Sequence, residues 1–383
     1  MSPFAKDFVG FLFGFVWVTA FSGCDKIWGG YVVSNDARSA ACAEATCDNP
    51  LSDGSESVDG YAGDGSASDG SDLSITNPTV VIVGQAGGIW RRDFDKKQWV
   101  PENSGTTLDL LAVHGASKNN LAAVGGNTVT RWTGAGWSVS TVTEVPGGSA
   151  SLRSVFVGGD GQLWAGSAKG YVHWLASNGV WSSRRPTASS LNRSYISTAM
   201  GGVFRLDGQT TVWAISNTAN CFIEPDGTLC GVKSMVANGV DANLSLVAAI
   251  TIKTADYPKI RAHGPGRLIT AGGEDILLSG STWTSTFYLA GKKLTSVWES
   301  SETNVWAVGP AGLVVHGTGD LTQPSNWVVT TLGTADFYDI YGLSAQNIWA
   351  VGSAGTVYHY NGTTWTPEVV DPTRTLHSVF ATY

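Results

Sequence analysis

A short element, most clearly Trp-Ala-Val-Gly, recurs from residue 77 onward and constrains the fold more than any other feature. It stands at 306–309 and 349–352, within two longer segments that match each other in pattern and order. Related elements occur at 81–84, 122–125, 164–167, 213–216 and 269–272, which gives seven copies. Each copy reads as four short strands separated by turn residues. Such repetition predicts one array of equivalent units rather than several unrelated domains.

Most copies start roughly 40 residues apart, the period of a four-stranded propeller blade. The composition agrees, because the 383 residues include 48 glycines and 16 tryptophans and only 14% are charged. This usage favours many short strands joined by tight turns. Residues 77–383 are therefore predicted to form an all-β domain, a seven-bladed β-propeller of four-stranded blades. Wider gaps around the fourth and fifth copies predict insertions at 184–210 and 231–266.

The two ends of this region complement each other. Residues 376–383, LHSVFATY, read as the first strand of a copy and nothing follows them. The first copy, in contrast, begins at VVIVG without a first strand. Pairing of the two segments would complete one blade and leave no open sheet edge. We therefore expect the C-terminal strand to close the propeller.

Tryptophan opens the fourth strand of six copies, where a flat ring can pack between neighbouring blades. These residues are Trp99, Trp137, Trp181, Trp283, Trp327 and Trp365. In the fourth copy Cys230 takes that place, and Cys221 lies across the intervening Pro-Asp-Gly turn. Cysteines that face each other on adjacent strands can be bridged. We therefore predict a disulfide between Cys221 and Cys230.

The N-terminus has the layout of an export signal. Residues 8–21 form an apolar run after Lys6, and the run is shorter than the about 20 residues that a membrane span needs. Its ending, FSGC, resembles the lipobox of bacterial lipoproteins, which implies a signal peptide at 1–23 and lipid attachment at Cys24. An uncleaved anchor and secretion with a free Cys24 thiol are the alternatives. The choice between inner and outer membrane stays open.

Residues 24–76 are rich in Ser, Gly and Asp and have few apolar side chains with which to form a core. We predict that they form a disordered linker between the lipid and the propeller. The acidic residues read as a solvated spacer, because the dense carboxylate pattern of a calcium loop is absent. Cys42 and Cys47 lie close together, so a local disulfide is expected in an oxidising compartment.

The repeats resemble the Trp-Ala-Val-Gly propellers of lipoproteins from δ-proteobacteria of the myxobacterial type. More distantly they are similar to the Asp-box and photosystem-assembly-factor propellers. The resemblance implies a lipid-anchored propeller of the cell envelope that faces the periplasm or the cell exterior. Those families include scaffolds, assembly factors and hydrolases, so the fold does not fix the activity. We expect a scaffold that binds a protein or glycan, with a sialidase-like glycan-processing enzyme as the alternative.

No catalytic residues are expected. A sialidase-like site needs an arginine cluster beside its nucleophile and acid, and arginines do not recur at the first-strand positions that line a propeller channel. His173, His316 and His359 hold nearly the same third-strand place in different blades, which argues against a shared metal. Phosphate-loop and zinc-pair motifs are also missing from the sequence. We therefore expect neither a metal nor a cofactor.

The charge distribution limits the classes of partner that we expect. A net charge of −8 disfavours nucleic acid, and membrane contact is expected through the lipid alone. Against this acidic background the two predicted insertions carry cations, which form our candidate partner surface. These residues are Arg184, Arg185, Arg193, Lys253, Lys259 and Arg261. The protein is expected to be a monomer whose partner is an unknown protein or glycan.

Overall fold

The computed structural model describes most of the chain from Asn77 onward. The described ranges are 77–143, 148–159, 161–168, 171–176, 178–184, 195–204, 210–218, 228–238, 241–251, 259–262, 268–272, 275–279, 283–289 and 291–383. The predicted signal peptide and linker, with Cys24, Cys42 and Cys47, lie outside them. Within these ranges the regular elements are β-strands and three 3₁₀ turns, Gln85–Gly87, Pro324–Asn326 and Ser353–Gly355. None of the described segments is a helix long and apolar enough to cross a membrane.

The strands form four-stranded antiparallel sheets. The sheet that we call the junction sheet has the order β28, β1, β2 and β3, with bounds Leu376–Thr382, Thr79–Gly84, Ile89–Asp93 and Gln98–Glu102. Sheet β4–β7 comprises Ala112–Ser117, Asn120–Gly125, Thr128–Trp132 and Trp137–Thr141. Sheet β8–β11 comprises Leu152–Val157, Leu163–Ser167, Val172–Leu175 and Trp181–Arg184.

The remaining sheets follow the same order along the chain. Sheet β12–β15 comprises Tyr195–Phe204, Thr210–Thr218, Thr228–Asn238 and Asp241–Thr251. Sheet β16–β19 comprises Lys259–Ala262, Leu268–Gly272, Asp275–Ser279 and Trp283–Tyr288. Sheet β20–β23 comprises Ser296–Ser301, Asn304–Val308, Leu313–Thr318 and Trp327–Thr331. Sheet β24–β27 comprises Phe337–Ser344, Asn347–Gly352, Thr356–Tyr360 and Trp365–Val369.

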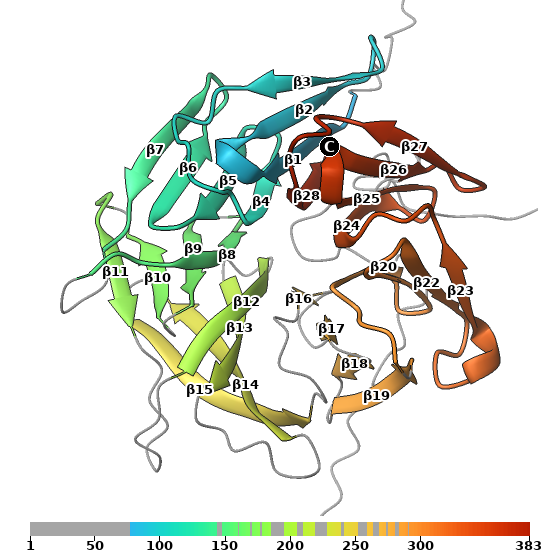
Figure 1. Ribbon diagram of the computed structural model, residues 1–383. Coiled ribbons are helices and arrows are strands. Elements are labelled where there is room, and N and C mark those ends of the chain that lie inside the picture. The colour runs from blue at the N-terminus through green and yellow to red at the C-terminus, as the bar shows by residue number, and fades with distance from the viewer. Residues whose placement is uncertain are drawn as a thin grey trace, which may run out of the picture.

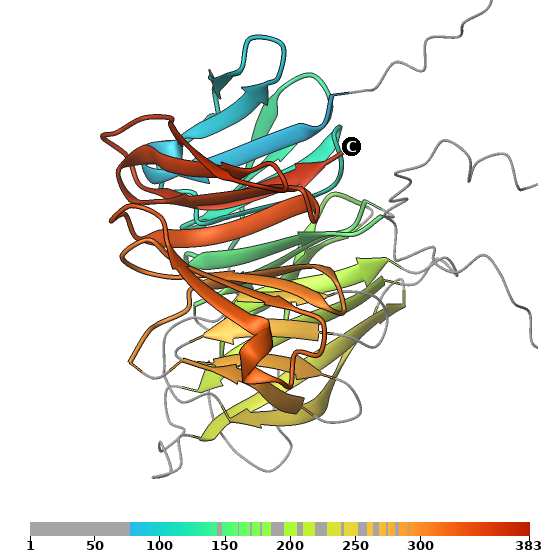
Figure 2. The same cartoon turned by 90° about the vertical axis from the view of Figure 1, so that its right-hand side faces the viewer.

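The sheets stand around a common centre, with their first strands inward and their last strands outward (Figure 1). Figure 2, turned by 90°, shows them from the side as successive layers. The first strands contact one another in the order β4, β8, β12, β16, β20, β24 and β28, and β28 also contacts β4. Side chains on these strands therefore meet at the centre of the molecule.

The Trp-Ala-Val-Gly elements form the second strands, which are covered on both faces. In β5 and β25 the last five residues are buried, as expected for strands between packed layers. The glycine that closes the element is required because there is no room for a Cβ atom at this position. A Cβ on Gly84 or Gly352 would collide with the backbone carbonyl oxygen of the residue that leads into the first strand of the same sheet. The recurring glycine thus follows from a close backbone approach.

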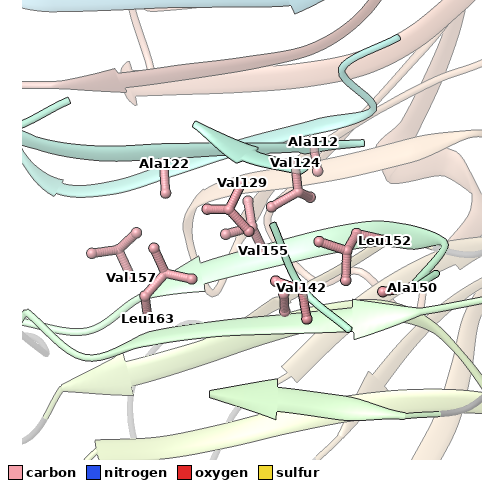
Figure 3. Packing of buried hydrophobic residues seen from close by; sticks show 11 residues of the cluster. Ala112, Ala122, Val124, Val129, Val142, Ala150, Leu152, Val155, Val157 and Leu163 are labelled. Atoms are coloured by element: carbon pink, nitrogen blue, oxygen red, sulfur yellow. The ribbon is translucent and has the colours of Figure 1, made fainter. Parts of the chain in front are cut away.

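The hydrophobic core lies between neighbouring sheets. Figure 3 shows one such cluster, formed by sheets β4–β7 and β8–β11. Val124, Leu152 and Leu163 are fully buried there and pack against Val129 and Val155. Each fully buried aliphatic side chain of this size contributes about 1.5–3 kcal/mol. Alternation of such residues along the strands therefore holds successive sheets together.

The fourth-strand tryptophans pack between sheets, as the sequence predicts. Trp99 and Trp137 each donate a hydrogen bond from Nε1 to a glutamate of an adjacent sheet. Trp365 lies with its ring centroid 5.6 Å from that of Trp306 in the adjacent sheet. The side chain of Trp283 is outside the described part.

Two expectations for the middle copies are wrong. Insertions are predicted at 184–210 and 231–266, but residues 195–204 form β12, and much of 231–266 forms the long strands β14 and β15 together with β16. Cys230 lies in β14, a third strand paired with β13 and β15, so it does not take the place of a fourth-strand tryptophan. The extra length is absorbed by longer strands with additional backbone hydrogen bonds. Cys221 lies outside the described ranges, and the disulfide stays a prediction.

Candidate functional site

The first strands present two equivalent positions toward one another. The first position faces the third residue of the Trp-Ala-Val-Gly element across the sheet, and the second lies two residues later on the same face of the strand. The first position holds Ala112, Ser154, Lys259, Ser296, Asp339 and Ser378. The second holds His114, Phe156, Arg261, Trp298, Tyr341 and Phe380. Sheet β16–β19 thus carries two cations where the other sheets in these lists carry small, acidic or aromatic residues.

Asp339 is the fully buried acid of this centre. Its Oδ1 accepts a hydrogen bond from Ser296 Oγ at 2.6 Å, and its Oδ2 accepts one from Ser378 Oγ at 2.6 Å. The backbone N–H groups of Val379 and Ile340 also donate to the carboxylate, each at 3.1 Å. One side chain of β24 therefore connects the first strands of both adjacent sheets.

Lys259 and Arg261 bring positive charge to Asp339 from β16. Arg261 Nη2 lies 2.9 Å from Asp339 Oδ1, and Lys259 Nζ lies 3.6 Å from Oδ2. The two cationic side chains are 24% and 17% exposed, whereas the carboxylate is completely covered. Because sheet β20–β23 stands between β16 and β24 in the order of contacts, these ion pairs span the centre of the molecule. The Arg261 guanidinium also lies 5.3 Å from the ring centroid of Tyr341.

The electrostatics of the cluster keep Asp339 ionised. Burial by itself would raise the pKa of Asp339, but the charges of Lys259 and Arg261 and the serine hydroxyls hold this pKa below its ordinary value. Burial lowers the pKa of Lys259, and the neighbouring Asp339 carboxylate acts against that effect. The Arg261 guanidinium and the Asp339 carboxylate therefore form a close ion pair.

An aromatic group surrounds the second position. The His114 ring lies 4.8 Å from Phe156 and 4.9 Å from Phe380, and Phe380 lies 5.0 Å from Tyr341. His114 Nδ1 accepts a hydrogen bond from the backbone N–H of Val157 at 3.1 Å. Burial, helped by the nearby Arg261 charge, lowers the pKa of His114 to about 3. His114 is therefore a neutral packing residue near pH 7.

The chemistry available at this centre is structural. A carboxylate offers about four acceptor positions, and the donors around Asp339 occupy them. Such a group holds strands in place and is poorly suited to accept a substrate proton. Among the described residues no three His, Cys, Asp or Glu side chains gather as metal ligands would.

The predicted histidine pattern has a local explanation. His316 stacks on Trp306 at 3.5 Å and His359 on Trp349 at 4.7 Å, each opposite the tryptophan of its own sheet. The Nε2 atoms of these histidines lie 3.0 and 2.6 Å from an asparagine Oδ1 at the start of the second strand. His173 is shifted by one position and lies opposite Ala165. These residues therefore belong to the repeat and sit in separate sheets.

The structure separates the predicted partner surface. Lys259 and Arg261 lie in β16 and pair with Asp339, which contrasts with their predicted place in an insertion. Arg184 ends β11, and its side chain is not described. Arg185, Arg193 and Lys253 lie outside the described ranges. The partner surface as a whole thus stays a prediction.

Sequence reasoning missed Asp339. Arginines were predicted not to recur at the first-strand positions that line a channel; Arg261 of β16 holds such a position, and Arg153 lies elsewhere in β8. The available signal for Asp339 was an acidic residue inside an otherwise apolar first strand, FYDIYG, where other copies have Ser296 or Ser378. A buried carboxylate needs a charged or hydrogen-bonding partner, and that requirement could have directed attention to Arg261.

Comparison with solved structures defines the fold class. A structure of YCF48 bound to D1 peptide matches with a TM-score of 0.50 at 14% identity, covering 72% of this chain and 92% of that one. The WD40 β-propeller domain of Doa1 matches with a TM-score of 0.50 at 16% identity, covering 70% and 85%. The fold is propeller-like. A Bacteroides fragilis structure named as a candidate 6-phosphogluconolactonase matches with a TM-score of 0.55 at 10% identity, covering 81% and 99%.

At these identities the likeness concerns the propeller fold alone. No protein-family model matches this chain, and no curated protein matches it. The prediction of an all-β, propeller-like domain built from four-stranded antiparallel sheets is confirmed. Activity and partners have to be argued from the chain itself.

Proposed function

We propose that this chain is a lipoprotein of the cell envelope whose propeller serves as a monomeric scaffold for a protein or glycan partner. In this proposal the seven sequence copies form seven blades, and the C-terminal strand closes the ring. Lipid on Cys24 and the linker 24–76 attach the scaffold to the membrane outside the cytoplasm. The proposed disulfides, Cys42–Cys47 and Cys221–Cys230, would form in that oxidising environment.

The scaffold role is supported by one observation: the charged side chains at the centre of the molecule bind one another. Asp339, Lys259 and Arg261 pair with one another and with the strands around them. A centre of this kind supports a rigid frame whose loops remain available for recognition. YCF48, a propeller whose structure contains a bound peptide, supports a protein partner for such a frame. Because Lys259 and Arg261 are paired internally, the proposed partner surface is reduced to Arg184, Arg185, Arg193 and Lys253.

Metabolic labelling tests the membrane anchor. Cells that express the full chain are grown with radiolabelled palmitate, and the wild type is compared with Cys24→Ala. We expect label on the wild type and none on the variant. Equal labelling of the two proteins would overturn lipid attachment at Cys24. Labelling of neither would favour secretion or an uncleaved anchor.

A glycoside screen separates the binding role from the enzymatic alternative. The purified full chain is incubated with chromogenic sialosides, hexosides and hexosaminides at several pH values. We expect no release of chromophore above a heat-denatured control. Turnover that scales with protein concentration would overturn the scaffold role and favour a sialidase-like enzyme.

A further inference from the structure

Two fourth strands share the motif Trp-x-Pro-Glu. It spans Trp99–Glu102 in β3 and Trp365–Glu368 in β27. At the position of the glutamate, the other tryptophan-containing fourth strands have Ser140, Arg184, Thr286 and Thr330. The motif therefore occurs only in the junction sheet and in the sheet that packs beside it.

Glu368 connects sheet β24–β27 to the junction sheet. Its Oε2 accepts a hydrogen bond from Trp99 Nε1 at 2.6 Å, and its Oε1 lies 2.9 Å from Arg92 Nη2. The side chains of Arg92 and Glu368 are 12% and 20% exposed, so the pair is partly shielded from water. Hydrogen bonds to a charged acceptor are stronger than neutral ones.

Glu102, which belongs to the junction sheet itself, makes a related connection on the other side, although its arginine partner, Arg91, lies in the same sheet. Its Oε2 accepts a hydrogen bond from Trp137 Nε1 of sheet β4–β7 at 2.7 Å. Arg91 Nε lies 2.6 Å from Glu102 Oε1, and the Arg91 guanidinium stands 4.6 Å from the ring centroid of Trp132. The junction sheet is thus joined to sheet β24–β27 by the bonds of Glu368 to Arg92 and Trp99, and to sheet β4–β7 by the Trp137–Glu102 hydrogen bond and the contact of Arg91 with Trp132.

The junction sheet is also the one that directly follows the linker. β1 begins at Thr79 and lies between β28 and β2, hydrogen-bonded to both. Strand β28 lies beside β1 (Figure 1). Their pairing starts at the residue nearest the linker, where Thr79 faces Thr382. A pull on the linker therefore acts first on β1 and on the meeting point of the first and last strands.

We propose that the junction sheet carries the mechanical load between the propeller and its membrane linker, and that Glu102 and Glu368 transmit this load to the two neighbouring sheets. The proposal rests on the membrane anchorage proposed above. Tension on β1 is resisted by its strand pairing, while the two glutamates keep the junction sheet from separating as a unit. The load is then shared by three sheets.

Force measurements on the full chain test this role. One handle is attached before residue 77 and the other at an unnatural residue replacing the 59%-exposed Val328 of β23, so that the load crosses the junction sheet. Wild type is compared with Glu102→Ala, Glu368→Ala and the double variant. Ser140→Ala and Thr330→Ala, at the equivalent positions of β7 and β23, are matched controls. We expect each glutamate variant to unfold about tenfold faster at a given force, since the lost bonds involve a charged group.

Hydrogen exchange without force provides the second readout. In the double variant we expect faster exchange at 79–84 and 376–382 and unchanged exchange at 313–318. If the glutamate variants unfold under force at the wild-type rate, the proposed role of the two glutamates in carrying load is overturned. If the control variants change the unfolding rate under force by the same amount, the two glutamates have no role that the equivalent positions lack. Neither result depends on palmitate labelling, so a failed anchor and a failed attachment device are distinguishable.

Discussion

The guanidinium of Arg261 lies 2.9 Å from the buried carboxylate of Asp339, although the two residues belong to sheets separated by a third. The same carboxylate accepts hydrogen bonds from Ser296 and Ser378 of the two adjacent sheets. Four sheets therefore depend on one side chain. The central charges hold several sheets together, so their removal should destabilise the contacts between those sheets.

Replacing Asp339 by Asn should destabilise the protein strongly. The substitution leaves Arg261 and Lys259 largely buried without their counter-charge, and breaking a buried ion pair of this kind costs about 3–5 kcal/mol. Urea unfolding at pH 7 measures the change in the free energy of unfolding. Asp320→Asn is the control, because Asp320 is exposed in a turn. A loss below about 1 kcal/mol for Asp339→Asn would show that the cluster is not needed for stability.

His114 should make the protein sensitive to mild acid. Its pKa is lowered to about 3 in the folded protein, whereas an unfolded histidine titrates near 6.5. Between these values the unfolded chain binds a proton that the folded chain does not, so stability falls as the pH drops from 6.5 toward 3. The slope for one proton is at most about 1.4 kcal/mol per pH unit.

His114→Phe isolates this contribution. Phenylalanine occupies the equivalent position at Phe156 and Phe380, so the ring should fit among its neighbours. At pH 7 we expect a loss of about 1 kcal/mol, because the Val157 N–H loses its acceptor. Urea unfolding at pH 7, 6, 5 and 4 should show that the free energy of unfolding falls less steeply with pH in the variant than in the wild type. Parallel pH profiles would refute the role of His114.

A third glutamate should strengthen a junction that lacks one. Trp181 Nε1 is buried, and no acceptor for it lies among the described residues. The equivalent tryptophans Trp99 and Trp137 bind a glutamate from the preceding sheet, where β7 has Ser140. Ser140→Glu should therefore stabilise the protein by about 1 kcal/mol. Val139→Glu adds the same charge on the opposite face of β7, and equal effects of both substitutions on the melting temperature would argue against the predicted contact.

Deletion of residues 376–383 should destabilise the whole propeller. The truncation removes β28, exposes one edge of β1, and takes Ser378 and Val379 away from Asp339. We expect the full chain to melt in one cooperative thermal transition and the truncated protein to lose that transition. A truncated protein that melts like the parent would contradict the proposed closure by the C-terminal strand.

The sequence was most informative where the copies are most alike. The Trp-Ala-Val-Gly elements predicted buried second strands, and their closing glycines are needed because a Cβ at Gly84 or Gly352 has no room. The tryptophans at 99, 137 and 365 pack between sheets as predicted, because an outer strand offers a large ring only the adjacent sheet to pack on. These features are local and repeat in every clear copy.

The parts that could not be predicted depend on contacts between distant copies. Asp339 and Arg261 lie 78 residues apart, and neither belongs to the repeated pattern. Their pairing depends on which strands face the centre, and the spacing of residues along the chain does not predict which of those residues come into contact. The prediction for the fourth copy was wrong for a different reason. Strands β14 and β15 are longer than the other strands, so Cys230 lies in the third strand of its sheet and not in the fourth.

Cross-linking in cells tests the scaffold role most directly. Full-length wild type, Arg184→Glu/Arg185→Glu and Arg184→Lys/Arg185→Lys are cross-linked in their native envelope, and the products are identified by mass spectrometry. We predict that the wild type and the lysine variant recover the same protein or glycan partner and that charge reversal abolishes it. Identical products from all three proteins would contradict the assigned surface, and no product above the uncross-linked control would contradict the scaffold role itself.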